Sequence, residues 1–313
     1  MSRLRELVEA GEEPILTCEA PAVDGGDLDG FASRVAEVVR WADAVNATDN
    51  TAAHAHASNV SVAIALLRVG AEPILQVVCR DKNRLACEAD IVGAALHGVE
   101  NVCCLTGDDV TAGDEPEARR VFDLDGPQLV RVATGLAEGH YLSGRAIEPP
   151  PRLFVGAVEN PAAAPLDYRP LRALKKIEAG ARFLQLQICY YPDRLEAFAA
   201  ALAADGRAAG VALLPTIVLV RGSRQLEFMD ANVPGISVPP ETIARVRRAA
   251  DEAEGAYQLA LEQARHALSL PGIRGLHLTD FRRDGALSRL CADLGLAPRE
   301  EREAHAHRSA VGV

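Results

Sequence analysis

The sequence predicts a single-domain α/β protein of the (β/α)8 TIM-barrel class. Eight short runs rich in Val, Ile and Leu recur along the chain, and each is followed by turn residues and a helical pattern. Eight such units also account for the 313 residues without a linker or a low-complexity segment. No GxGxxG motif follows the first run, which disfavours the alternative of a doubly wound open sheet.

The eight runs are expected to be the barrel strands. Most are continuously apolar rather than alternating, which is typical of parallel strands covered on both faces. The expected strands are residues 14–20, 43–49, 73–79, 101–107, 152–160, 183–189, 211–220 and 272–281. The barrel is expected to occupy residues 1–298, and the polar residues 299–313 to form a disordered C-terminal tail.

Amphipathic helices are expected between the strands. After the first run, apolar residues recur at i, i+4, i+7, i+8 and i+11, a single stripe made of Phe31, Val35, Val38, Val39 and Ala42. Similar stripes follow the sixth run at Leu195, Phe198 and Leu202, and the eighth at Leu287, Leu290, Cys291 and Leu294. Each stripe is suited to pack its helix on the outside of the barrel.

Composition and charge exclude several classes of protein. The net charge of −11 argues against a nucleic-acid partner, which needs a basic surface for phosphates. The N-terminus lacks a signal-peptide core, and no stretch approaches the roughly 18–20 uninterrupted apolar residues of a spanning helix. We therefore expect a cytoplasmic protein without a membrane partner.

The seven cysteines are an odd number without a CxxC pair, which favours reduced thiols over a disulfide framework. Cys103 and Cys104 are neighbours on an expected strand, so their side chains should point to opposite faces. A disulfide between them would be strained. We interpret both as small apolar packing residues.

Polar side chains stand at the ends of almost all expected strands, where the chemistry of this fold class is located. These residues are Glu19, Thr48, Asp49, Gln76, Thr106, Asp108, Glu159, Asn160, Gln185, Gln187 and His277. Any one of them would be unremarkable as a helix cap or loop anchor. Together they predict a polar pocket at one end of the barrel.

Several common sites are absent from the sequence. It contains no Walker-type phosphate loop, no HExxH motif and no GxSxG elbow. An HxH pair occurs at His54 and His56, in the loop after the second run, and another at His305 and His307 in the tail. A metal pair at the first position is one interpretation, and a loop wall over the pocket is the other; we expect no metal site.

Five segments occur in an order that resembles the methylenetetrahydrofolate reductase family of flavin-dependent (β/α)8 barrels. They are "VCRDKNR" (78–84), "LTGDD" (105–109), "GDEPEARRVFDLDGPQL" (113–129), "LKKIEAGARFLQLQ" (174–187) and "EFMDANVPGI" (227–236). The resemblance covers nearly the whole chain. It implies FAD as cofactor, NADH or NADPH as co-substrate, a tetrahydrofolate derivative as substrate, and a homo-oligomer.

The resemblance also implies roles for particular residues. Glu19 corresponds to the family's general acid, which protonates the folate so that its five-membered ring opens to an iminium. Asp108 corresponds to an acid beside the flavin and the folate, and Gly107 would let the backbone approach the ring. The implied substrate-binding residues are Glu19, Gln185, Gln187 and Phe228. The implied cofactor-binding residues are Thr48, Gln76, Thr106, Gly107, Asp108, Asn160, Arg172, Lys175 and Lys176.

The chain also departs from the family pattern. Gln76 stands where a histidine is common, and Thr106 where some members have an arginine. Asn160 replaces a longer histidine-containing loop. Two alternatives therefore stay open beside the oxidoreductase: a flavin-free folate-binding barrel that acts as a methyl-transfer or one-carbon complex subunit, and a non-catalytic scaffold subunit of such a complex.

Overall fold

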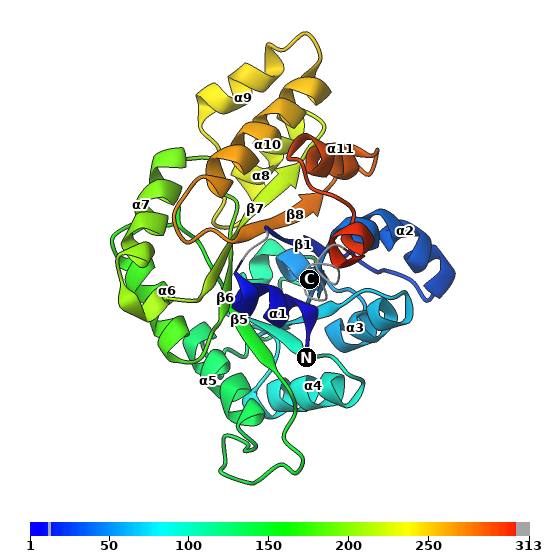
Figure 1. Ribbon diagram of the computed structural model, residues 1–313, viewed down its shortest axis with the longest axis vertical. Helices are drawn as coiled ribbons and strands as arrows, with labels where there is room; N and C mark the ends of the chain where they lie inside the picture. Colours follow the sequence, from blue (N-terminus) through cyan, green and yellow to red (C-terminus); the bar gives the residue numbers. More distant parts are fainter. Residues whose placement is uncertain (12–13, 305–313) are drawn as a thin grey trace, which may run out of the picture.

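The predicted barrel is confirmed. The structure, a computed structural model, describes residues 1–11 and 14–304, and in it eight parallel strands close into a barrel in the order of the sequence, with β1 paired to both β2 and β8 (Figure 1). The strands are β1 (Ile15–Glu19), β2 (Ala44–Ala47), β3 (Pro73–Val78), β4 (Asn101–Leu105), β5 (Phe154–Glu159), β6 (Phe183–Leu186), β7 (Ala212–Leu219) and β8 (Gly275–Asp280). Every strand lies inside the run predicted for it.

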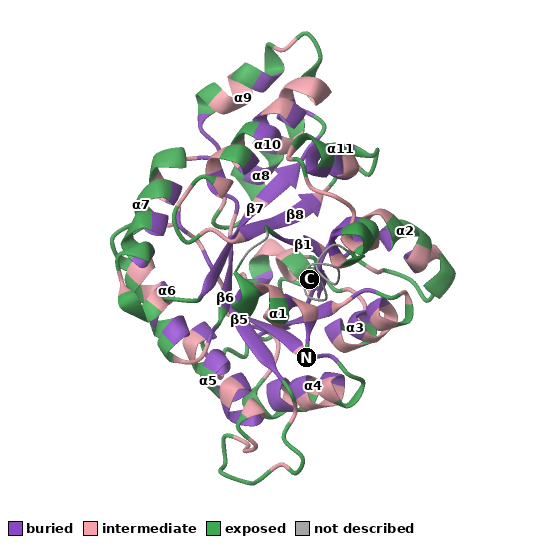
Figure 2. Ribbon diagram, in the orientation of Figure 1, coloured by how far each residue is buried: buried purple, intermediate pink, exposed green. Residues whose placement is uncertain are grey.

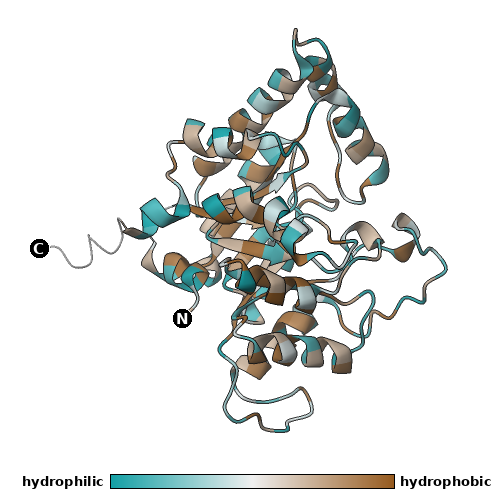
Figure 3. Ribbon diagram, turned by 90° about the vertical axis from the view of Figure 1, so that its right-hand side faces the viewer, coloured by the Kyte–Doolittle hydropathy of each residue, from teal (hydrophilic) through white to brown (hydrophobic). Residues whose placement is uncertain are grey.

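Helices surround the barrel, and Figure 3 shows hydrophilic and hydrophobic residues alternating along them. They are α1 (Arg3–Ala10), α2 (Leu28–Trp41), α3 (Asn59–Arg68), α4 (Arg84–Leu96), α5 (Gly126–Ala137), α6 (Tyr168–Glu178), α7 (Pro192–Ala203), α8 (Ser223–Asn232), α9 (Pro240–Arg247), α10 (Glu252–Leu268) and α11 (Ala286–Asp293), with short 3₁₀ turns η1 (Thr51–Ala53), η2 (Val110–Ala112) and η3 (Gly206–Ala208). Within residues 1–11 and 14–304, no helix has the length and apolar character needed to cross a membrane.

The stripe predicted after the first strand positions α2. Phe31, Val35 and Val38 are buried in it, and the Asp27 side chain caps the helix by accepting the backbone N–H of Gly30 at 3.0 Å.

Between β7 and β8 the chain inserts α8 and α9 before α10. This segment extends the molecule at the top of Figure 1.

The apolar core has two main layers, and the strands are its most buried part (Figure 2). The layer inside the barrel includes Cys103 and Phe183, and the layer between strands and helices includes Cys104, which confirms that the adjacent cysteines face opposite sides. Both are free thiols. Gly156 makes room for Phe183, because a Cβ at this glycine would lie 2.3 Å from the aromatic ring.

The amino-terminal end of the barrel is closed by α1, which lies over the barrel centre in Figure 1 and packs Leu4 and Val8 onto the inner layer. Beside it, fully buried Asp43 accepts the N–H of Leu16 at 2.8 Å and two bonds from Arg302 Nη1, at 2.7 and 2.8 Å.

The first six residues of the expected disordered tail are ordered. Residues 299–304 are helical, and the buried ion pair between Arg302 and Asp43 holds them against the barrel. The remaining tail residues, 305–313, which include His305 and His307, lie outside the described residues.

Candidate active site

A cavity of about 380 Å3 opens at the carboxyl ends of the strands. It brings together ten of the residues predicted for the site, namely Glu19, Gln76, Thr106, Gly107, Asp108, Asn160, Arg172, Lys176, Gln185 and Gln187. It also includes Asp49, Arg80, Glu159, Arg169 and His277. Seven different strands, or the turns directly after them, contribute to this set, so the polar strand ends share one pocket, as the sequence predicted.

The floor of the cavity is a polar network inside the barrel. Asn46 and Gln185 exchange two amide hydrogen bonds, at 2.9 and 3.0 Å. Next to them, His277 Nδ1 lies 2.9 Å from Thr17 Oγ1, and its Nε2 lies 3.8 Å from Oε1 of Glu19. Glu19 is thus held above a hydrogen-bonded floor rather than an apolar one, with its carboxyl group half-buried at the end of β1.

Three glutamines line the cavity, in three different states. Gln185 is committed to the floor by its pair with Asn46. Gln187 uses Oε1 to accept the N–H of Ile188 at 3.0 Å, which leaves its N–H₂ group for a ligand. Gln76 is 7% exposed, and within the described residues its side chain makes no hydrogen bond.

The turn after β4 presents Asp108 to the cavity. Gly107 has φ +92°, and a Cβ there would lie 2.5 Å from Val78 Cγ1, so both conformation and packing require glycine. Burial raises the pKa of Asp108, and the charge of Arg80 opposes that shift. Asp109 is exposed and paired with Arg120 at 2.6 Å, as a solvent-facing acid should be.

On the opposite side, β5 and α6 form a basic cluster around the buried Glu159. Its Oε2 lies 2.6 Å from Lys176 Nζ and 3.8 Å from Arg172 Nε, and its Oε1 lies 3.5 Å from Arg169 Nη1. Burial lowers the pKa of Lys176, with Arg172 adding to the shift and Glu159 opposing it. Arg169 is fixed by two bonds to the carbonyls of Ala163 and Ala164, at 2.8 and 2.6 Å.

Comparison with known proteins identifies the family of the chain. The sequence model of the family described as methylenetetrahydrofolate reductase matches residues 21–295. The chain belongs to this family. Membership makes the protein a folate-related oxidoreductase. No curated protein sequence matches it significantly.

Comparison of this methylenetetrahydrofolate reductase family member with solved structures finds matches at low identity. EDTA monooxygenase from Chelativorans sp. BNC1 has a TM-score of 0.50 and 11% identity, over 91% of this chain and 99% of that chain. A 2,3-dimethylmalate lyase of the PEP mutase/isocitrate lyase superfamily has a TM-score of 0.49 and 14% identity, over 99% of this chain and 87% of that chain. At such identity the likeness to the monooxygenase shows the fold alone.

Three residues suggested by the family resemblance lie outside the main cavity. Lys175 is exposed and its Nζ lies 3.1 Å from the hydroxyl of Tyr168. Phe228 is 62% exposed on α8. Thr48 is buried and lines a neighbouring cavity of about 230 Å3, which shares Glu19 with the main one.

Sequence reasoning did not assign Arg80 or Arg169 to the site. Arg80 follows β3 directly, within the quoted "VCRDKNR" segment, so its strand-end position was an available signal. Arg169 lies in the first turn of α6, and only the packing of that helix brings it to the cavity. The inward face of α6 could be predicted from the sequence, because Ala173, Lys176 and Ile177 share one helical face. All three are buried in the structure.

The histidine pair after β2 shows no metal-binding geometry. The rings of His54 and His56 are 6.5 Å apart, and His56 Nδ1 contacts Asp24 at 2.5 Å. Among the described residues, no group of three or more His, Cys, Asp or Glu side chains is placed to hold a metal ion. His54 and His56 instead line the smaller cavity beside Glu19.

Proposed function

We propose that the protein is a flavin-dependent oxidoreductase that interconverts 5,10-methylenetetrahydrofolate and 5-methyltetrahydrofolate, with NADH or NADPH as electron partner. The observation that carries this proposal is the convergence of Glu19, Asp108 and Gln187 from three separate strand ends on one cavity. Membership in the methylenetetrahydrofolate reductase family supports it.

The residues of the cavity fit FAD. Arg169 and Arg172 add two positive charges beside the Glu159–Lys176 pair, a donor set suited to a diphosphate. Gln76 is buried and its side chain has no hydrogen-bond partner among the residues that the structure describes, so it offers both a donor and an acceptor to the edge of a flavin ring. When bound, FAD supplies the hydride-transfer chemistry of the reaction.

Residues at the ends of β1, β4 and β6 bind and protonate the folate. Glu19 donates a proton to a nitrogen of the five-membered ring, and the electrons of the breaking C–N bond stay on that nitrogen, which leaves an iminium group. Gln187 donates its free amide N–H to the pterin. The half-buried carboxylate of Asp108 orients the pterin and favours the positive charge of the iminium.

A visible spectrum and a turnover assay of the purified protein test the proposal. We expect flavin absorbance near ~450 nm, and oxidation of NADH or NADPH that depends on methylenetetrahydrofolate. A colourless protein without turnover after addition of FAD contradicts the proposal. If such a protein binds tetrahydrofolate tightly, the flavin-free methyl-transfer or one-carbon subunit takes its place.

The nicotinamide electron partner and the oligomeric state are proposed from the family resemblance. Initial rates with NADH and with NADPH, measured in both directions, identify the electron partner and the favoured direction. We also expect a homo-oligomer, which light scattering of the eluting protein would show as a mass that is a multiple of 33.3 kDa.

A further inference from the structure

Asp49, just beyond the end of β2, is a buried carboxylate with one free oxygen. The residue is 4% exposed and lines the cavity. Its Oδ2 accepts the N–H of Val78 at 3.0 Å and a bond from Lys82 Nζ at 2.7 Å. Among the described residues, Oδ1 has no hydrogen-bond partner, and it is not one of the buried atoms left unsatisfied. Oδ1 therefore keeps access to solvent, and it belongs to a residue that lines the cavity.

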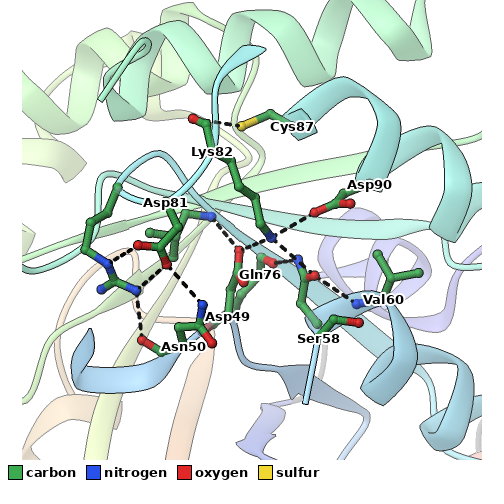
Figure 4. Close-up of polar contacts among 12 residues, drawn as sticks. Asp49, Asn50, Ser58, Val60, Gln76, Asp81, Lys82, Cys87 and Asp90 are labelled. Atoms are coloured by element: carbon green, nitrogen blue, oxygen red, sulfur yellow. Dashed lines mark hydrogen bonds and ion pairs between the residues drawn. The ribbon is translucent and has the colours of Figure 1, made fainter. Parts of the chain in front are cut away.

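The charges around Asp49 do not balance. Lys82 also contacts Asp90 at 2.8 Å and Oδ1 of Asn59 at 3.3 Å, so its charge is already compensated without Asp49 (Figure 4). The nearby Arg80 is bound bidentately to Asp81, at 2.7 and 2.6 Å. Burial raises the pKa of Asp49, and Lys82 only opposes that shift. A carboxylate in excess of its cations is costly for stability, and such groups concentrate at functional sites.

The backbone next to Asp49 is strained and held in place. Asn50 and Ala52 have φ +47° and +53°, in the left-handed region that asparagine tolerates but alanine rarely adopts. Arg80 Nη2 donates to the carbonyl of Asn50 at 3.0 Å. Asn50 Nδ2 donates to Asp81 at 3.1 Å, as Figure 4 shows. Strain of this kind persists where surrounding contacts enforce it, often at ligand-binding sites. The "RDK" of the quoted segment 78–84 thus fixes the loop that carries Asp49.

We propose that Asp49 is a further substrate-binding residue, whose Oδ1 accepts a hydrogen bond from an N–H or amino group of the reduced pterin ring, and that Lys82 positions it. This inference rests on the proposed function, which makes a pterin the substrate. A donor-rich ring suits a free carboxylate oxygen, whereas a phosphate would be repelled by it. The alternative is that Asp49 only completes the ion pair of Lys82.

Calorimetric titration of the purified, cofactor-loaded protein with 5-methyltetrahydrofolate tests this. Asp49→Ala should weaken binding by about 10- to 100-fold, as expected for a hydrogen bond to a charged group. Lys82→Met removes the ion pair that positions the Asp49 side chain. It should weaken folate binding by a smaller factor and leave the amount of bound flavin unchanged. Asp90→Asn is the matched control, because Asp90 contacts the same lysine but lies outside the cavity, and it should leave binding within about twofold.

A double variant is the control for misfolding of Asp49→Ala. Asp49→Ala with Lys82→Met removes both members of the ion pair, and it should bind folate as weakly as Asp49→Ala. The inference is overturned if both Asp49 variants bind 5-methyltetrahydrofolate within about twofold of the parent, or if they lose flavin while folate affinity stays unchanged. Failure of the parent protein itself to bind folate overturns the proposed function instead.

Discussion

The two sides of the cavity mouth carry opposite charge, although the chain as a whole is acidic. On the β1–β4 side, Glu19, Asp49 and Asp108 present carboxyl groups that have few cationic partners. On the β5–α6 side, three cations surround the single acid Glu159. Under the proposed function, this polarity would direct the diphosphate of FAD towards α6 and the donor-rich pterin of the folate towards β1–β4. Net charge alone, −11, conceals this arrangement.

The largest expected effect comes from removing the acid on the β1 side. Glu19→Gln keeps the size of the side chain but removes the transferable proton, so folate turnover should fall by about 10²- to 10⁴-fold. Stopped-flow absorbance measures this separately from reduction of the flavin by NADH or NADPH, which needs no proton donation to folate and should be unchanged. Equal losses in both half-reactions would contradict a specific role in folate protonation.

The next effect tests the centre of the basic side. Lys176→Met leaves Glu159 buried without its 2.6 Å partner, which should lower the free energy of unfolding by about 3 kcal/mol. Urea denaturation measures this change. Lys175→Met, at the adjacent exposed position of the same helix, is the matched control and should unfold like the parent. Similar losses in both variants would show that the inward face of α6 has been assigned incorrectly.

The basic side should also decide cofactor affinity. Arg172→Gln removes one of the two arginine charges that line the cavity beyond the Glu159–Lys176 pair, so FAD should bind about 10-fold more weakly. Fluorescence titration of the apoprotein with FAD and with riboflavin measures this. The loss should be confined to FAD, because riboflavin lacks phosphates; a similar loss for riboflavin would place Arg172 away from the diphosphate.

The smallest effect concerns stability on the acidic side. Burial raises the folded-state pKa of Asp108, so the ionised side chain costs the folded protein free energy near pH ~7. Asp108→Asn should therefore raise the free energy of unfolding at that pH, by less than about 1 kcal/mol because the group is only half-buried. As pH falls through the raised pKa, the parent carboxyl becomes protonated and the advantage should disappear. Urea unfolding across the acidic range measures both variants.

A matched control for that comparison is the neighbouring acid. Asp109→Asn changes an exposed carboxylate whose pKa is lowered to below its usual range by Arg120 and Thr111. Its stability should change in the opposite sense, with the parent favoured at neutral pH and the difference lost on acidification. A stabilising effect of Asp109→Asn at neutral pH would show that the two aspartates have been distinguished incorrectly.

Much of the fold and part of the site could be predicted from the sequence. All eight strands lie within predicted runs because continuous apolar stretches and helical stripes are local signals that parallel packing does not change. The same strand ends identified Glu19, Gln76, Asp108 and Gln187 as cavity residues, since the carboxyl ends of barrel strands meet at one mouth. The direction in which Cys103 and Cys104 point followed from strand geometry alone.

The sequence by itself therefore determined the barrel, its strand order and the polar mouth, because these depend on periodicities of a few residues. Tertiary structure alone decided which polar groups remain free. The side chain of Gln185 is hydrogen-bonded to Asn46, and Phe228 lies outside the cavity. Arg302 pairs with Asp43, which is more than 250 positions away in the sequence. Only the closed barrel brings Arg169 and Asp49 to the same cavity. These outcomes depend on how helices rotate on the sheet and which distant side chains meet, and short-range patterns carry no record of either.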